Sequence, residues 1–260
     1  MHRDLRQAIG YSLALTGLHL IGCAFPGSLN WGFHFLGFLP AWHCALYIAA
    51  VILTILFVVK GTSDQLIAAI AHRMAQRPLR FFFVIVFLFV TCGVVFRIHI
   101  PLLGDGFYLV RNYVEAYRGI APLYPRDEPL ATYYFSAILG ATGTSTFQQF
   151  LNAFLIGDLL LAIGFLINVF MIVRTLFVSG VARLLAVCFL LSPAYMQLFF
   201  GYVETYAVVL FALSFYINIS VLYLYDKISF SPVPFSFLLT TLTHYLALLL
   251  LPSLLLLTYR

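Results

Sequence analysis

The sequence has very few charged residues. They make up 9% of its 260 residues, whereas hydrophobic residues make up 63% and the mean hydropathy is +1.03. A soluble globular domain carries about 25% charged residues and could not bury so much apolar surface. The scarcity of charge therefore excludes an ordinary soluble fold. Apolar runs of about 18 residues or more predict membrane helices instead.

Cysteine is also scarce. Cys23, Cys44, Cys92 and Cys188 each lie in or beside an apolar run, and none belongs to a CxxC or a His/Cys pair with metal-ligand spacing. This pattern indicates neither a disulfide framework nor a zinc site and is typical of small buried side chains. The net charge of +5 does not indicate a nucleic-acid partner, because the basic residues are scattered near the ends of the apolar runs.

Seven apolar runs predict an all-α, polytopic membrane protein. They cover residues 8–25, 42–59, 81–100, 147–173, 184–200, 207–225 and 234–257. The fifth is interrupted at Ser192-Pro193, and the seventh carries His244 and Pro252. We expect an amino-terminal segment at 1–80, with two spans and an amphipathic helix that begins at the capping box of Thr62 and Gln65. Residues 81–260 would form the membrane core.

The distribution of Lys and Arg predicts an orientation. With the amino terminus in the cytoplasm, nine basic residues fall on the inner side and five on the outer side. The outer five are Arg97, Arg111, Arg118, Arg126 and Arg260. We therefore expect a protein of the plasma membrane, in bacteria the inner membrane, whose connection after the third span faces outward.

That connection, from Arg97 to Tyr134, holds four of the nine carboxylates: Asp105, Glu115, Asp127 and Glu128. Asp105 stands between two glycines and could cap a helix or act as a base. Asp127 and Glu128 precede Pro129, which predicts a second helix start. The sequence thus predicts two short helices on the outer interface. We expect Arg111, Glu115 and Arg118 to form a solvated, salt-bridged face on the first one.

Three further ionisable residues lie in or near apolar runs. Glu204 follows the fifth run in a short turn and is a functional candidate. For Asp158 we expect a hydrogen bond to a neighbouring helix through Asn152 or Asn168, and for His244 a structural place in the core. The many tyrosines predict an aromatic belt at the membrane interface, although the same rings could stack on sugars.

Three motifs resemble those of the GT-C superfamily of membrane glycosyltransferases, in particular the branch of protein O-mannosyltransferases and aminoarabinose transferases. They are Asp105 after an outward-going span, Glu128-Pro129-Leu130, and Ser192-Pro193 followed by Glu204. The resemblance implies transfer of a sugar from a polyprenyl-phosphate lipid to a glycan, lipid or protein acceptor. It makes Asp105 the general base.

The resemblance also implies roles for other residues. Arg97 or Arg126 would meet the phosphate, and Glu128 and Glu204 would orient sugar hydroxyls or hold a divalent metal. Asp127 and Tyr202 complete the expected substrate-binding set. The chain departs from the family's pattern at Gly106, where the branch often has Glu, and at Asp127-Glu128, which replace its His-Pro. Family members usually have more spans, so we expect a truncated or compact relative.

Two other functions stay open. The chain could be a transporter that uses Asp158, Glu204 and His244 as a polar path through the membrane, or a noncatalytic membrane subunit. The transferase hypothesis expects Asp105 and Glu204 to face one shared cavity outside the membrane. The transport hypothesis expects a path through its interior.

Overall fold

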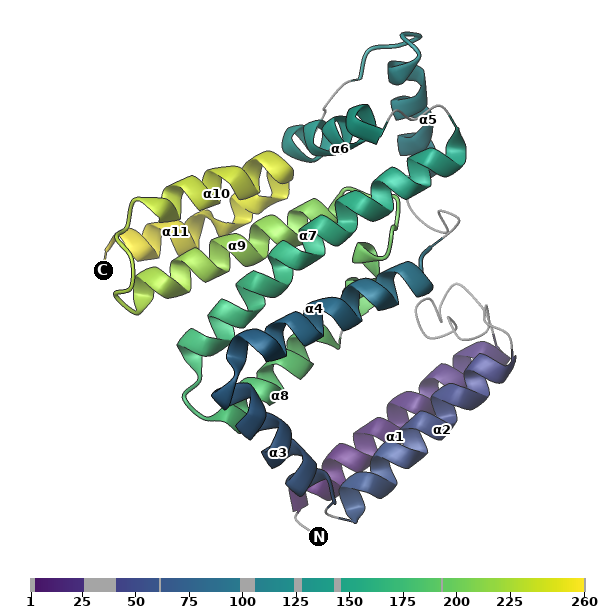
Figure 1. Cartoon of the computed structure of the whole chain (residues 1–260), viewed down its shortest axis with the longest axis vertical. Helices are drawn as coiled ribbons and strands as arrows, with labels where there is room; N and C mark the ends of the chain where they lie inside the picture. The colour runs from purple at the N-terminus through teal and green to yellow at the C-terminus, as the bar shows by residue number, and fades with distance from the viewer. Residues whose placement is uncertain are drawn as a thin grey trace. The chain divides into compact units, whose positions relative to one another are not determined.

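The computed structural model describes residues 3–25, 41–60, 62–98, 106–123, 128–142, 146–192 and 194–259, and these residues form helices and turns without any strand (Figure 1). The prediction of an all-α fold is confirmed. The chain divides into two compact units, Met1–Ile70 and Ala71–Arg260, which we call unit 1 and unit 2. The sequence predicted a division at residue 80.

Unit 1 contains the helices α1 (Arg3–Ala24) and α2 (Ala41–Val59), followed by the first residues of α3 (Thr62–Gln76). The first two helices pack against each other, with the His19 ring edge-on to Tyr47 at 6.5 Å between centroids. The amphipathic helix predicted from Thr62 is confirmed as α3. Its basic face is exposed at His72 and Arg73, whereas Ala71 and Met74 are buried.

Three helices of unit 2 are long and apolar enough to cross a membrane: α4 (Pro78–Val95), α7 (Phe147–Leu176) and α9 (Tyr206–Leu224). A fourth crossing results if α2 and α3 count together as one broken span. The described residues are therefore compatible with a membrane protein of three or four spans. The predicted number of seven is not confirmed.

The predicted interruption of the fifth span is confirmed at Ser192, whereas the seventh span is wrong as a continuous helix. The fifth consists of α8 (Gly180–Leu191), which ends at Ser192, and a separate 3-10 helix η3 (Ala194–Phe199). The seventh consists of α10 (Pro232–Thr243), the 3-10 helix η4 (Tyr245–Leu250) and α11 (Leu251–Thr258). These pieces contain 12 residues or fewer, which is short of the ~20 residues that a spanning helix needs.

The chain reverses direction at His244. This residue has an extended backbone, with φ −164° and ψ 130°, between α10 and η4. Val233 near the start of α10 and Leu257 near the end of α11 belong to one buried cluster, so the two arms of the hairpin lie side by side (Figure 1). An apolar sequence such as that of residues 234–257 is compatible with one long helix and equally with two short helices.

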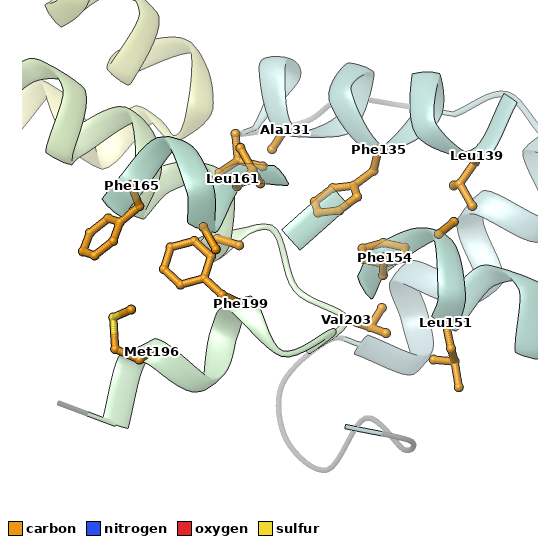
Figure 2. Packing of buried hydrophobic residues seen from close by; sticks show 14 of the residues in the cluster. Ala131, Phe135, Leu139, Leu151, Phe154, Leu161, Phe165, Met196, Phe199 and Val203 are labelled. Carbon is orange, nitrogen blue, oxygen red and sulfur yellow. The ribbon is translucent and has the colours of Figure 1, made fainter. Parts of the chain in front are cut away.

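The two short helices predicted between the third and fourth spans are confirmed as α5 (Gly106–Tyr117) and α6 (Pro129–Thr142). Pro129 is the first residue of α6, as predicted from the acidic pair before it. Figure 2 shows how α6 is fixed on α7: Phe135 stacks on Phe154 with 4.2 Å between ring centroids. The tyrosine hydroxyl of Tyr134 also donates to the carbonyl oxygen of Gly157, at 2.7 Å.

The helices α7, α9 and α10 are joined by buried hydrogen bonds. The Asn168 amide donates to the Ser214 hydroxyl at 3.0 Å and accepts from the Asn218 amide at 3.1 Å. The Thr240 hydroxyl donates to the Ala212 carbonyl oxygen at 3.0 Å. In a membrane, an apolar helix surface gains little by leaving lipid for another helix, so interhelical hydrogen bonds such as these help to hold the helices together.

Candidate functional site

Unit 2 contains a cavity of about 610 Å³ where α5, α6, the start of α9 and the turn at His244 meet. Its volume lies within the range of about 300–1,000 Å³ that is usual for small-molecule sites. The polar side chains that line it come from all four of these segments. They are Tyr108, Asn112, Glu115, Glu128, Thr132, Tyr206, His244 and Tyr245.

One wall of the cavity depends on how α5 ends. Gly119 has a left-handed backbone with φ 69°, its amide donates to the Ala116 carbonyl oxygen, and the Ile120 amide donates to that of Glu115. This is the Schellman pattern, which a glycine adopts without steric cost. It folds the chain back, so that Ala121 to Leu123 line the cavity beside Glu115.

Glu128 lies directly before α6, and its side chain is 21% exposed. Its carbonyl oxygen accepts the amide of Thr132 at 3.0 Å, which places it at the amino end of the helix. A carboxylate there interacts favourably with the positive end of the helix dipole. Its Oε1 atom is 3.5 Å from Nε2 of His244, whose side chain is 13% exposed.

The hydrogen bonding of His244 fixes which ring nitrogen carries the proton. Nδ1 accepts the backbone amide of Leu246 at 3.1 Å, so it must be unprotonated. The neutral ring therefore carries its proton on Nε2, the atom that faces Glu128. This nitrogen lies 3.5 Å from one carboxylate oxygen of Glu128, close enough for electrostatic attraction but longer than a regular hydrogen bond.

Aromatic rings flank this pair. His244 stacks on Tyr245 at 5.0 Å and 21° and on Tyr206 at 6.3 Å and 27°. Tyr108 on α5 adds a further ring to the lining. Flat aromatic faces beside carboxylates suit a ligand with both apolar C–H surface and hydroxyl groups.

The second carboxylate of the lining, Glu115, accepts the Nε–H of Arg111 at 2.7 Å. The solvated ion pair predicted for α5 is thereby confirmed for these two residues. Behind the lining, the Tyr113 hydroxyl donates to the Thr132 carbonyl oxygen at 3.3 Å. Burial raises the pKa of Tyr113 above its usual range, so this hydroxyl stays neutral at physiological pH.

The structure brings only part of the predicted site to this cavity. Asp105, Arg126 and Asp127 lie outside the described residues. Of the described ones, Glu128 lines the cavity, whereas Arg97, Tyr202 and Glu204 do not. The Arg97 guanidinium donates to the Asn152 side chain at 2.9 Å, and Glu204 is buried, with 7% of its surface exposed.

The expectation for Asp158 is wrong. Asn152 accepts from Arg97 and Gln148, and Asn168 bonds to Ser214 and Asn218, so neither is engaged with this carboxyl group. Asp158 is fully buried in α7, and the Gly201 backbone amide lies close to it, but neither carboxyl oxygen makes a hydrogen bond of regular geometry within the described residues. The prediction failed because both asparagine side chains bond to other residues.

The sequence did not single out Tyr206 or Tyr245, placed Glu115 only in an ion pair, and considered His244 only as a core residue or as part of a transport path. The one available signal was a histidine followed by a tyrosine in the middle of an apolar run. A polar break in such a run is typical of non-helical backbone that lines a cavity.

The described His, Cys, Asp and Glu side chains nowhere form a group of three that could hold a metal ion. A divalent metal therefore stays a prediction from the resemblance. Comparison of the chain with family models, curated proteins and solved structures finds no match.

Proposed function

We propose that the cavity is the active site of a membrane glycosyltransferase that moves a sugar from a polyprenyl-phosphate donor to an acceptor on the outer face of the membrane. The observation that carries this proposal is the Glu128–His244 pair on the wall of a tyrosine-lined cavity, at the ends of apolar helices. Tyrosine rings suit the C–H face of a sugar, and carboxylates suit its hydroxyl groups.

The chemistry needs a base close to the acceptor. The proton of the acceptor hydroxyl passes to the free oxygen of Glu128 while the acceptor oxygen bonds to the anomeric carbon. The bond from that carbon to the lipid phosphate breaks, and polyprenyl phosphate leaves with the electron pair. His244, whose Nε2 lies 3.5 Å from Oε1 of Glu128, would orient the base.

The family resemblance assigns the base to Asp105 instead. Both carboxylates belong to the same connection between the third and fourth spans. In a site with two acids, one takes the proton and the other orients sugar hydroxyls. The outward direction of the site rests on the count of basic residues, and its place in a bacterial inner membrane is part of the proposal.

The test is a transfer assay on the purified chain in liposomes. Polyprenyl-phosphate donors carrying glucose, mannose, arabinose or aminoarabinose are supplied together with an envelope extract as the source of acceptor. We expect one donor to release polyprenyl phosphate faster than in liposomes without protein. Equal release with and without protein for every donor would rule out the proposal.

The transport hypothesis has less support. It needs Asp158, Glu204 and His244 on one path, and among these described residues only His244 lines the cavity. A noncatalytic role stays open, and the same assay separates it from the transferase.

A further inference from the structure

Five arginines surround the other end of unit 2, where α7 ends and α4 and α8 begin. We call Arg73, Arg77, Arg80, Arg174 and Arg183 the basic rim. Within the described part of the chain, none of them forms an ion pair with a carboxylate. Their charge is therefore available to an anion from outside the protein.

Two of these arginines line a small cavity of about 70 Å³. Its other walls are apolar and come from α3, α4, α7 and α8: Met74, Ala75, Pro78, Phe170, Val173 and Val187. The junction is tightly packed, because Met74 and Val173 are buried and a Cβ atom at Gly180 would lie 3.1 Å from the Ala71 carbonyl oxygen. The cavity thus combines an apolar base with two guanidinium groups.

Both guanidinium groups are held in place without a carboxylate. Arg174 lies over the ring of Phe170, 5.7 Å from its centroid. Arg183 donates its Nε–H to the Phe177 carbonyl oxygen at 2.7 Å, which leaves the terminal N–H groups of its fork for a ligand. Neither the start of α4 nor that of α8 has a side-chain cap, so their backbone amides add positive potential.

We propose that this cavity binds the phosphate of an anionic phospholipid. A lipid is favoured over a soluble phosphate because α4, whose first residue Pro78 lines the cavity, carries an exposed apolar row that begins at the next residue. Leu79, Phe83 and Phe87 recur every four residues and are 64%, 65% and 70% exposed. This row offers an acyl chain an apolar surface on the helix that starts at the cavity, and basic pockets between membrane helices are known to bind lipid headgroups.

The experiment is native mass spectrometry of the full chain in detergent with added phosphatidylglycerol or phosphatidylcholine. We expect phosphatidylglycerol to be retained about ten-fold more tightly, because only its headgroup has a net negative charge. Inorganic phosphate should displace little of it. Equal retention of the two lipids would overturn the proposal, and ready displacement by phosphate would indicate a soluble ligand and also overturn it.

Variants locate the site. In R174Q/R183Q we expect phosphatidylglycerol to bind about ten-fold more weakly or worse, whereas R73Q/R80Q removes two rim charges outside the cavity and should change binding little. Equal losses in both would show diffuse surface attraction and contradict a built site. If R174Q/R183Q does not fold, R174K/R183K can be used instead. It keeps the positive charge but loses the paired N–H donors of the guanidinium group, so it should still bind phosphatidylglycerol more weakly than the wild type.

Discussion

A buried tyrosine, Tyr113, and a half-buried one, Tyr134, make stability depend on alkaline pH. Burial raises the pKa of Tyr113 and of Tyr134, and the charge of Asp158 adds to the shift at Tyr134. In the unfolded chain tyrosine titrates near pH 10. Above that pH the unfolded state binds fewer protons than the folded state, so the free energy of unfolding must fall as pH rises.

We therefore expect the thermal unfolding midpoint in detergent to be steady up to about pH 9 and to fall above about pH 10. Y113F/Y134F should flatten this decline, although loss of the Tyr134 hydrogen bond lowers the starting value. Y133F is the matched control, because Tyr133 is 65% exposed. A decline of the same slope in both variants would show that other groups cause it.

At the residue scale, the sequence predicted correctly the features that depend only on neighbouring residues. Pro129 after two acids indicated a helix start, and the spacing of Arg111 and Glu115 indicated their ion pair. The contact of His244 with Glu128 was not predicted, because it depends on the chain reversal that brings the ring 3.5 Å from a residue over a hundred positions earlier. A pattern of neighbouring residues in the sequence cannot predict a contact between residues so far apart.

At the scale of elements, the contact between α7 and α9 depends on Gly164. A Cβ atom there would lie 2.5 Å from the ring of Phe211, which is packed against the core and stacked on Phe215. We expect Gly164→Ala to lower the free energy of unfolding by about 1–3 kcal/mol. Unfolding in detergent, followed by circular dichroism, measures the change.

Gly140→Ala provides the control for this prediction. A Cβ atom at Gly140 meets nothing within 4 Å in α6, so helix propensity should make the change neutral or stabilising by up to about 1 kcal/mol. If the two variants behave alike, the close approach of α7 to α9 is not supported.

The hairpin of α10 and α11 gives a prediction about sidedness. If the chain reverses at His244, the segments before α10 and after α11 lie on the same side of the membrane. In a chain whose native cysteines are replaced by serine, Ser229→Cys and Thr258→Cys should react with an impermeant thiol reagent from the same side. Both positions are exposed. Labelling from opposite sides would contradict the hairpin and support one continuous seventh span.

The elements that the sequence predicted well are those with one uninterrupted apolar run and charged residues beyond its ends. This applies to α4, α7 and α9, whose ends lie within a few residues of the prediction except at the end of α4. The seventh span was wrong because a single residue, His244, ends a helix inside an apolar run, whereas the sequence showed the break at Ser192 in the fifth. Hydropathy shows that a run of residues prefers an apolar environment, but it does not show whether the run forms one uninterrupted helix.

At the scale of the molecule, unit 2 has a different chemistry at each end of α7. This helix has 30 residues and is about 45 Å long. The tyrosine-lined cavity adjoins the helices that pack on its amino-terminal half, and the basic rim surrounds its carboxyl end. Such an arrangement suits an enzyme that is anchored by lipid at one surface and acts at the other.

The central claim is that Glu128 serves sugar transfer, and Glu128→Gln tests it most directly. The substitution keeps the shape of the side chain and its contact with His244 but removes the basic oxygen. In the liposome assay we predict a rate of polyprenyl phosphate release that is about 10²–10⁴-fold lower, with helix content unchanged and with Asp226→Asn as an active control. Release at the wild-type rate by folded Glu128→Gln would contradict the account.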